Sequence, residues 1–170
     1  KETYLFKKGD NLFNYHRAKE SAKKSKSLII VEGQMDAIRV SSSGFENVVA
    51  LMGTALTKEQ IELIKKLHVK VLLNLDSDSA GEHADLLNGD LLIKANLPVQ
   101  VVTLSDAKDP DEYILKFGPE AYKKNLNNAV DYFDFKMLVQ KKGINPNNSE
   151  EIATYINSLL EDLNNVSDSI

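Results

Sequence analysis

The sequence contains no cysteine, and it has no run of about eighteen uncharged apolar residues that could cross a membrane. The absence of cysteine excludes disulfide bonds, thiolate zinc sites and cysteine nucleophiles from this chain, and it is compatible with a reducing cytoplasm. The first residues, KETYLFKKGD, include neither an initiator methionine nor an apolar signal core. We therefore expect a globular cytoplasmic domain that is neither secreted nor inserted in a membrane and that was cut from a longer protein.

Common catalytic motifs are also missing. The sequence has no H-E-x-x-H zinc motif, no G-x-S-x-G nucleophile motif and no Walker loop. His16, His68 and His83 lie in separate segments without the spacing of metal ligands, so exposed helical positions are expected for all three. Hydrolysis through a serine nucleophile has no support in this sequence.

Charge is unevenly distributed along the chain. Residues 1–26 hold eight Lys/Arg and three Asp/Glu, which gives this end +5, whereas the remainder carries −9. Basic ends commonly bind phosphate, and acidic bodies sometimes hold a divalent metal. A solvated lysine-rich face explains the basic end equally well.

Four short runs, 27–33, 47–53, 69–76 and 99–105, are nearly continuous in Val, Ile and Leu. Such runs are typical of strands that are covered on both faces, and they predict a parallel sheet of about four strands. Each connecting segment is long enough for a right-handed crossover helix. The sequence therefore predicts an α/β fold with helices on both faces of the sheet.

Two of the connecting segments begin with capping boxes, formed by Thr57 with Gln60 and by Ser79 with Glu82. In the second of these helices the apolar positions fall on one face, which we expect to be buried. Those positions are Ala84, Leu87, Leu91 and Ala95.

No strand is predicted after residue 105. A short helix over 109–118 should end at Gly118, and Pro119 suits the first turn of the next helix. Ser149 should cap a last helix with a wide apolar stripe, which must bury against its own domain or against a partner. The stripe consists of Ile152, Tyr155, Ile156, Leu159, Leu160 and Leu163.

Carboxylates gather at the predicted ends of the strands, where ligands bind in open parallel sheets. Like charges about 5 Å apart repel by roughly 3 kcal/mol at an effective dielectric constant near 20, so the cluster opposes folding unless it is protonated or neutralised by a cation. Oxygen ligands suit Mg²⁺ or Mn²⁺, so we interpret the cluster as a metal site. The acids are Glu32, Asp36, Asp76, Asp78, Asp109 and Asp111.

Simpler roles exist for some of these residues. A D-x-D sequence is common in a turn before a helix, because carboxylates favour helix N-termini. Asp36 could be an ordinary acid of a first helical turn, and Asp109 could cap the helix that Pro110 begins. Gly33 and Gly53 could be plain turn residues, although glycine at a junction between strand and helix also lets backbone N–H groups approach a phosphate.

Four segments together resemble the Toprim catalytic core of bacterial DnaG-type replicative primases: VEGQMDA (31–37), LMGTALT (51–57), LDSDSAG (75–81) and DPDEYILKFG (109–118). The first and third indicate only a Toprim fold, which type IA and II topoisomerases, small nucleases and a recombination mediator share. The other two narrow the resemblance to primases, and KKGDNLFNYHRAKE (7–20) is similar to the segment that precedes the primase Toprim unit.

The sequence departs from the family at two places. The family often has an aromatic residue where this chain has Gln34, and often glycine where it has Ser77. Serine indicates that no positive φ is needed between the two acids, and the stacking role of an aromatic residue is not carried over to Gln34. Neither change removes a carboxylate.

The resemblance implies a DNA-directed RNA polymerase that makes short RNA primers on single-stranded DNA from ribonucleoside triphosphates. It implies a basic leading segment over 1–26, a Toprim core over 27–118 and a helical subdomain over 119–170. Catalysis would use Glu32, Asp76 and Asp78, with two Mg²⁺ or Mn²⁺ ions held by these and by Asp36, Asp109 and Asp111. The nucleotide would lie at Gly33, Gly53 and Thr54, and the template would contact Lys7, Lys8 and Arg17.

The resemblance also implies parts that this chain lacks, namely a zinc-binding domain before it and a domain after it that binds the replicative helicase. We therefore expect little primer synthesis by this chain alone. Two alternatives use the same acids: a Toprim nuclease similar to a ribosomal RNA maturase, and a non-catalytic module that binds nucleic acid. A phosphoacceptor receiver is disfavoured because 99–105 lacks the lysine that it needs.

Overall fold

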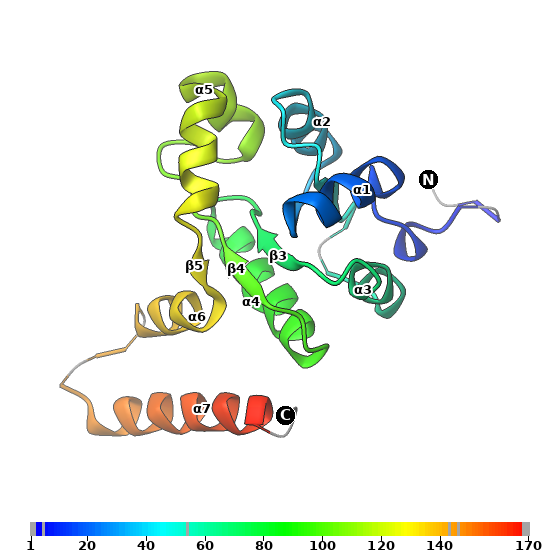
Figure 1. Ribbon diagram of the computed structural model, residues 1–170. Coiled ribbons are helices and arrows are strands. Elements are labelled where there is room, and N and C mark those ends of the chain that lie inside the picture. Colours follow the sequence, from blue (N-terminus) through cyan, green and yellow to red (C-terminus); the bar gives the residue numbers. More distant parts are fainter. Residues whose placement is uncertain (1–2, 5, 54, 143, 146, 168–170) are drawn as a thin grey trace.

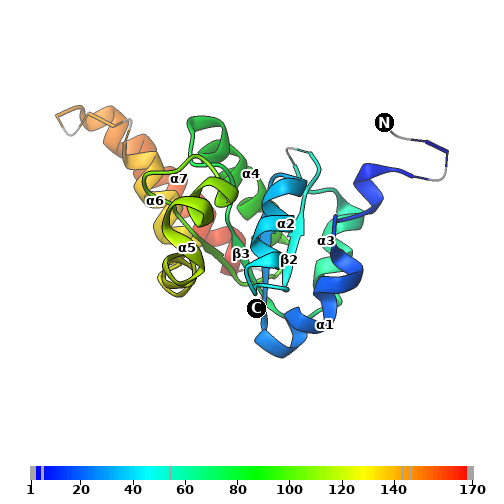
Figure 2. The same cartoon turned by 90° about the horizontal axis from the view of Figure 1, so that it is seen from above.

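The computed structural model describes residues 3–4, 6–53, 55–142, 144–145 and 147–167, with side chains described up to residue 160. A five-stranded sheet in the order β2-β1-β3-β4-β5 forms its centre, and Figures 1 and 2 show the helices arranged around it. The strands are β1 (Ser27–Val31), β2 (Val48–Ala50), β3 (Lys70–Leu73), β4 (Val99–Val101) and β5 (Val130–Asp131). The helices are η1 (Lys8–Asp10), α1 (Tyr15–Ser25), α2 (Gln34–Ser42), α3 (Lys58–Lys65), α4 (Ser79–Lys94), α5 (Pro110–Asn127), α6 (Tyr132–Lys141) and α7 (Ser149–Ser167).

The four strands predicted from apolar runs are present and mutually parallel, which confirms the α/β fold class. The prediction that no strand follows residue 105 was wrong, because β5 pairs antiparallel with β4. In that pairing Val130 lies opposite Val101 and Asp131 opposite Gln100. A strand of two residues carries no apolar run, so only its pairing partner defines it.

Helices cover both faces of the sheet. One apolar core includes Ala22 of α1, Ile64 of α3, Leu92 of α4 and Phe135 of α6, and the other includes Val40 of α2 and Ile114 of α5. All five residues of β1 are buried, as expected for a strand between two helical layers. Burying an aliphatic side chain stabilises a fold by about 1.5–3 kcal/mol, so these two layers fix the positions of the strand ends.

The capping box that the sequence predicts for α3 is present. Gln60 N–H donates to Thr57 Oγ1 (3.2 Å), and Thr57 N–H donates to Gln60 Oε1 (3.0 Å). The buried amide of Gln60 also donates to the carbonyl oxygens of Asn11 (2.7 Å) and Lys8 (3.2 Å). The same residue therefore starts a helix and anchors the basic leading segment.

The predicted capping box of Ser79 with Glu82 was wrong: α4 begins at Ser79 and Asp78 is its cap, because Gly81 N–H donates to Asp78 Oδ1 (2.8 Å). Of the predicted buried face of α4, Ala84, Leu91 and Ala95 are partly buried and pack against the core, whereas the prediction for Leu87 was wrong, since it is 42% exposed. The buried positions are Gly81, Asp85, Asn88, Gly89 and Leu92.

Tertiary neighbours explain this polar buried face of α4. A Cβ atom at Gly89 would lie 1.9 Å from Cε2 of Tyr132, so the ring of α6 packs directly on the helix backbone. The side chain of Asn88 accepts a hydrogen bond from Leu56 N–H (2.8 Å). Hydrophobicity alone cannot reveal a helix face that is chosen for close approach and hydrogen bonding.

Helix α5 is interrupted where the sequence predicts a boundary, because Gly118 has φ 81° and ψ 169° and Pro119 follows it. Beyond the break, Tyr122 is fully buried, and its hydroxyl donates to Asn74 Oδ1 (2.7 Å). The proposed division into 1–26, 27–118 and 119–170 remains a prediction.

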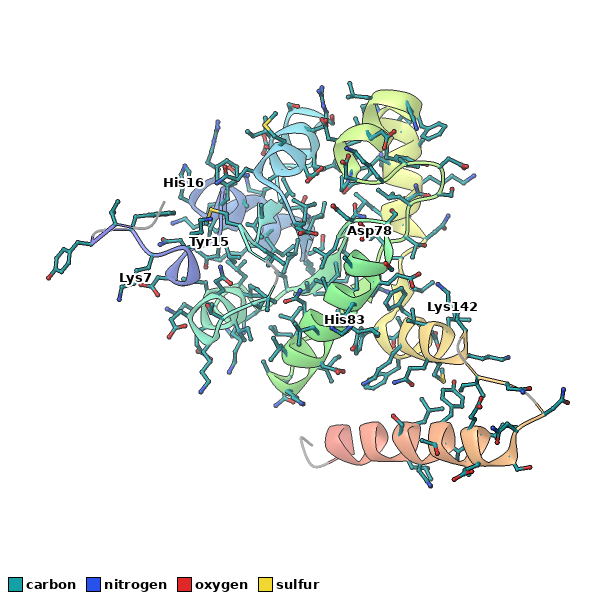
Figure 3. All side chains as sticks on the ribbon, turned by 180° about the vertical axis from the view of Figure 1, so that it is seen from behind. Lys7, Tyr15, His16, Asp78, His83 and Lys142 are labelled. Carbon is teal, nitrogen blue, oxygen red and sulfur yellow. The ribbon has the colours of Figure 1, made fainter. Side chains whose placement is uncertain are left out.

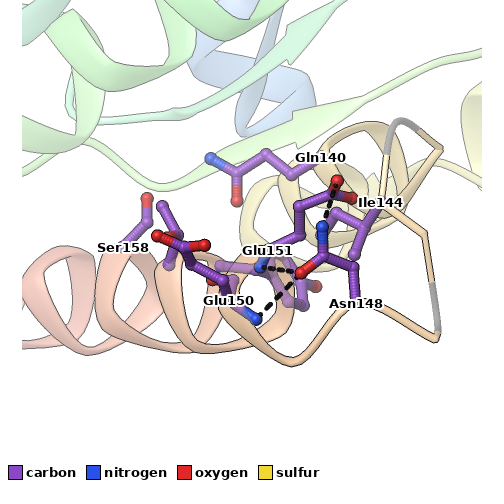
Figure 4. Close-up of a pocket in the computed structure, with 8 residues that line it drawn as sticks. Gln140, Ile144, Asn148, Glu150, Glu151 and Ser158 are labelled. Atoms are coloured by element: carbon purple, nitrogen blue, oxygen red, sulfur yellow. Dashed lines mark hydrogen bonds between the residues drawn. The ribbon is translucent and has the colours of Figure 1, made fainter.

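Helix α7 lies outside the two helical layers and contacts α4 and α6 (Figure 1). Its cap is Asn148 and not Ser149, since Asn148 Oδ1 accepts from Glu150 N–H (3.0 Å) and Glu151 N–H (3.4 Å) (Figure 4). The predicted apolar stripe is only partly covered, with Ile156 48% and Leu160 52% exposed, and Leu163 lies outside the described side chains.

A pocket of about 650 Å³ lies along the start of α7 (Figure 4). Its lining comes from the end of α6, the following loop and α7, and it includes none of the predicted site residues. Among the described residues, no helix combines the length and the apolar character needed to cross a membrane.

Candidate metal site

The predicted acids lie where parallel strands end. Glu32 follows β1, Asp76 and Asp78 follow β3, and Asp109 and Asp111 lie between β4 and the first turn of α5. The first turn of α2 adds a sixth acid, Asp36. Because β1, β3 and β4 are parallel, these positions meet at one edge of the sheet.

Mutual electrostatic effects show that the carboxylates are neighbours in space. Burial first, and then the charges of Glu32, Asp36, Asp109 and Asp78, raise the pKa of Asp76 to about 6. Burial likewise raises the pKa of Glu32, with added repulsion from Asp78 and Asp36. Neighbouring charges therefore add to burial in making Asp76 and Glu32 harder to ionise, as expected where anionic groups are gathered without a cation.

Asp36 is the most deeply buried of the six acids, and burial raises its pKa while an N–H donor from Asp111 opposes the rise. That donor reaches Asp36 Oδ1 at 3.2 Å. A Cβ atom at Gly33 would lie 2.6 Å from Asp36 Oδ2. Glycine at this position therefore makes room for the carboxylate, which is a structural reason for the Glu-Gly pair.

The D-x-D turn is held by two close backbone approaches. Ser77 N–H donates to the carbonyl oxygen of Lys108 (2.7 Å), which ties the end of β3 to the segment before α5. A Cβ atom at Gly81 would lie 1.9 Å from the carbonyl oxygen of Asp76. Glycine is therefore required there, because only hydrogen fits between the first turn of α4 and the D-x-D backbone.

Two of the acids have the capping role that the sequence left open. Asp78 Oδ1 caps α4, and Asp109 Oδ1 caps α5 by accepting from Glu112 N–H (2.7 Å). Each cap uses one carboxylate oxygen, and the second oxygen of Asp109 lies 3.5 Å from Nζ of the exposed Lys108, a weak pair that can exchange for another cation.

Arg39 is a site neighbour that sequence reasoning missed. Its Nε donates to Asp111 Oδ1 at 2.6 Å, and both side chains are partly exposed. Arg39 lies one turn after Asp36 in α2, but nothing in the sequence indicates a partner 72 residues later. This pair holds α2 against the start of α5 beside the carboxylates.

Asp85 is a second residue that the sequence did not single out. It lies in α4 and is only 5% exposed, its Oδ1 has no hydrogen-bond partner in the described part of the chain, and burial raises its pKa to about 8. It lines a small cavity of about 100 Å³ together with Asp76, Ser77 and Glu82. The sequence signal that could have identified Asp85 is a charged residue at a position on the buried side of a helix.

Within the described residues, no three His, Cys, Asp or Glu side chains stand close enough together to hold a metal ion as placed. The donor chemistry nevertheless fits a hard divalent cation, because the gathered groups are carboxylates, and the pKa values of Glu32 and Asp76 are raised. Mg²⁺ needs only one or two protein carboxylates and takes water or phosphate oxygens for the rest. The six acids therefore suit a shared cation without forming a closed cage.

The other predicted site residues are less closely grouped. Gly53 has open space around its Cβ position, and Thr54 lies outside the described residues. Lys7, Lys8 and Arg17 belong to the leading segment, and Figure 3 shows Lys7 at the far end of the molecule from Asp78. Their roles as nucleotide and template contacts stay predictions.

The histidines do not gather at the acidic edge. His16 and His83 are exposed helical residues, as predicted, and Figure 3 shows them well separated. His68 is exposed but lies in a left-handed turn (φ 54°) after α3, so its predicted helical position was wrong.

Comparison with known proteins places this arrangement in a family. The family described as Toprim-like matches residues 29–114. The DNA primase of Clostridium acetobutylicum is 38% identical over 160 residues, which cover 94% of this chain and 27% of that protein. The DNA primase of Enterococcus faecalis is 37% identical over 167 residues, or 97% of this chain and again 27% of the relative. The chain thus spans about a quarter of the length of these curated relatives.

Solved structures agree with the sequence relatives. The zinc-binding and RNA polymerase domains of the Aquifex aeolicus primase superpose with a TM-score of 0.77 and 34% identity, covering 98% of this chain and 41% of that one. A DnaG primase catalytic domain bound to ssDNA gives a TM-score of 0.85 at 24% identity, covering 98% and 55%, and it supports the fold. Because the family match covers about half of the 170 residues, the chain belongs to the Toprim-like family, and its relatives there are bacterial DNA primases.

Proposed function

We propose that this chain is the Toprim part of the catalytic core of a DNA primase, which synthesises short RNA primers on single-stranded DNA by phosphoryl transfer. The observation that carries the proposal is the row of carboxylates at the ends of β1, β3 and β4, where burial and then neighbouring charges raise the pKa values of Glu32, Asp36 and Asp76. Its relatives are primases, and the family's phosphoryl chemistry needs such a cluster of oxygen ligands.

Asp76 and Asp78 would hold a divalent cation, Mg²⁺ or Mn²⁺, with Glu32 as a third ligand or as a general acid/base. Asp109 and Asp111 would complete the site with water, and Asp36 would support them from α2. When bound, the cation supplies neutralising charge for the triphosphate and lowers the pKa of the attacking hydroxyl. The protein residues position these oxygens, because α4 and α5 are fixed by their caps.

The leading segment would contribute to template binding through Lys7, Lys8 and Arg17, and the glycines at Gly33 and Gly53, with Thr54, would lie beside the nucleotide. Lysine contacts with phosphates give binding that weakens with salt and reads no sequence. A zinc-binding domain and a helicase-binding domain would belong to the rest of the protein, and the whole would act in the cytoplasm. Alone, this chain should bind metal and nucleotide weakly and make little primer.

A chimera tests the proposal in a complete enzyme. The matching 160 residues of the Clostridium acetobutylicum primase would be replaced by this chain, and NTP-dependent RNA synthesis on single-stranded DNA would be measured with Mg²⁺ and Mn²⁺. We expect new RNA oligomers from the chimera and a loss of at least about 100-fold with Asp76→Asn. Glu46→Gln, an exposed acid elsewhere, is the matched control.

Strand shortening instead of new oligomers would support the nuclease alternative. A folded chimera that binds DNA but neither extends nor cuts would contradict both enzymatic functions and favour the non-catalytic module. Circular dichroism and melting of each chimera would show that a negative result concerns chemistry and not folding.

A further inference from the structure

A second charged surface lies at the opposite edge of the sheet from the carboxylates. It is a pocket of about 710 Å³ around the turns that lead into β1, β3 and β4. The acids follow the ends of these parallel strands, whereas the pocket surrounds their beginnings. We call it the basic pocket, after the residues Lys23, Lys26, Lys65, His68 and Lys70 that line it.

The basic pocket has a strong excess of positive charge. Its four lysines are exposed and come from two connections, α1–β1 and α3–β3, and no Asp or Glu is among its described lining residues. Its floor is apolar and buried, formed by Leu67, Val69 and Leu97. A concave surface with an apolar, low-dielectric floor focuses the electric field of the charges around it.

Two of the four lysines have an acid partner, and both pairs lie exposed to solvent. Lys23 lies 3.9 Å from Glu20 and Lys65 lies 3.3 Å from Glu62, and all four side chains are largely exposed. Exposed pairs of this kind contribute little and exchange readily for other partners. Lys70 Nζ donates to the neutral Gln100 Oε1 (2.9 Å), so that contact leaves its charge uncompensated.

The helix dipole offers a structural reason for part of this pattern. Lys23 and Lys65 lie in the last turns of α1 and α3, where positive charge stabilises a helix C-terminus. That reason does not extend to Lys70, which begins β3. Lys26 and His68 sit in left-handed turns (φ 56° and 54°), so their side chains project from short, well-defined connections.

The basic pocket continues a line of lysines along α1. Lys19 and Lys23 are four residues apart and share one side of α1, and Lys26 follows in the turn that ends the helix. This line belongs to the leading segment of net charge +5, whereas residues 27–170 carry −9. An extended polyanion would be repelled by most of the body and attracted along this side.

We propose that the basic pocket binds the sugar–phosphate backbone of single-stranded nucleic acid, as a contact surface separate from the acidic edge. Choosing nucleic acid among polyanions rests on the proposed function, whereas the attraction for phosphate rests on the charges alone. Lysine contacts with phosphates release counterions and read no base, so the pocket would hold a strand without sequence preference.

Fluorescence anisotropy with labelled oligo(dT) in EDTA tests this, because EDTA removes any metal from the acidic edge. The pocket variant is Lys26→Gln/Lys65→Gln/Lys70→Gln. The control variant is Lys58→Gln/Lys124→Gln/Lys141→Gln, which makes the same charge change at exposed lysines outside the pocket. Each phosphate contact contributes a slope of about −0.7 to log K against log salt for single strands, so the pocket variant should lose about 2 units of slope and bind at least about tenfold more weakly at 0.1 M salt.

The control variant should change affinity by less than about twofold. Equal losses in both variants, or no loss in the pocket variant, would overturn the proposal. Competition by poly-glutamate as effective as by oligo(dT) at equal charge would overturn it too, because the partner would then be an acidic polypeptide. If the triple variant does not fold, Lys70→Gln alone should remove about 0.7 of the slope.

The two proposals fail separately. If the chimera makes no RNA but the pocket variant loses DNA affinity as expected, only the proposed primase function is contradicted. If the chimera makes RNA but the pocket variant keeps its DNA affinity, only the proposed role of the basic pocket is contradicted.

Discussion

Replacing Asp85 by asparagine should remove a pH-dependent penalty from the folded state. The Asp85 carboxyl lies on the buried face of α4, where burial first and the charges of Glu82 and Glu32 next raise its pKa from 3.8 to about 8. Between about pH 4 and pH 8 the unfolded chain has released this proton while the folded chain keeps it. Since the folded state binds more protons there, the free energy of unfolding falls as pH rises.

The size of the penalty follows from the pKa difference. One unit is worth about 1.36 kcal/mol, so the roughly 3 units between the ordinary pKa and pH 7 give an upper bound of about 4 kcal/mol. Water that enters the small cavity beside Asp85 would lower this, so about 2–4 kcal/mol is expected at pH 7. The asparagine side chain would not ionise, and any change in its own hydrogen bonding would be the same at every pH.

Urea unfolding in metal-free buffer at about pH 5, 6, 7 and 8 measures the effect. The stability gained by Asp85→Asn should grow with pH, by up to about 1.4 kcal/mol per unit. Asp134→Asn, at an exposed position of α6, is the matched control and should run parallel to the unsubstituted chain. Parallel curves for Asp85→Asn as well would refute the reasoning, because the carboxyl would then titrate alike in both states.

Three further predictions concern the site and its supports. Without metal near pH 7, Asp76→Asn should be more stable than the unsubstituted chain, because the raised pKa of Asp76 marks an ionisation penalty that grows between its ordinary pKa and about 6. The melting temperature of this variant should rise less with Mn²⁺. An equal response to Mn²⁺ would contradict a role of Asp76 in cation binding. Gly81→Ala should lower the free energy of unfolding, measured by chemical denaturation, by about 1–3 kcal/mol, since its Cβ would meet the Asp76 carbonyl oxygen at 1.9 Å. Ala80→Gly is the control, because it changes a methyl group without that contact. An unchanged free energy of unfolding in Gly81→Ala would show that the turn can move aside. Tyr122→Phe should lower the free energy of unfolding by about 1–3 kcal/mol, because Asn74 Oδ1 loses its buried hydrogen-bond donor. Tyr155→Phe on α7 is the control. Equal small losses in the two variants would show that Asn74 finds another partner.

The sequence predicted the elements that are defined by local signals. Continuous apolar runs located the four parallel strands, and Gly118 with Pro119 located the interruption of α5. The capping box of α3 was predicted correctly, because both of its partners lie within one helical turn. The resemblance carried by the four motif segments was confirmed by the family match and by the primase relatives.

Features that depend on partners far apart in the chain could not be predicted from the sequence. Hydrophobicity located Ala84, Leu91 and Ala95 of α4 against the core. It missed Gly89 and Asn88, which are buried by the close approach of Tyr132 and by a hydrogen bond from Leu56. Strand β5 exists only because β4 leaves an edge to pair with. Arg39 and Asp111 are joined across 72 residues, which no local pattern can indicate.

The amino-acid sequence by itself determined that carboxylates follow the strands, since strand ends and acidic residues are both local features of the chain. Only the tertiary structure decided how they meet: parallel pairing places the strand ends at one edge, and burial there raises the pKa of Asp76 and Glu32. The same pairing gathers the turns before the strands into the basic pocket at the other edge. Charge and periodicity are encoded residue by residue, whereas proximity and dielectric environment arise only when the chain has packed.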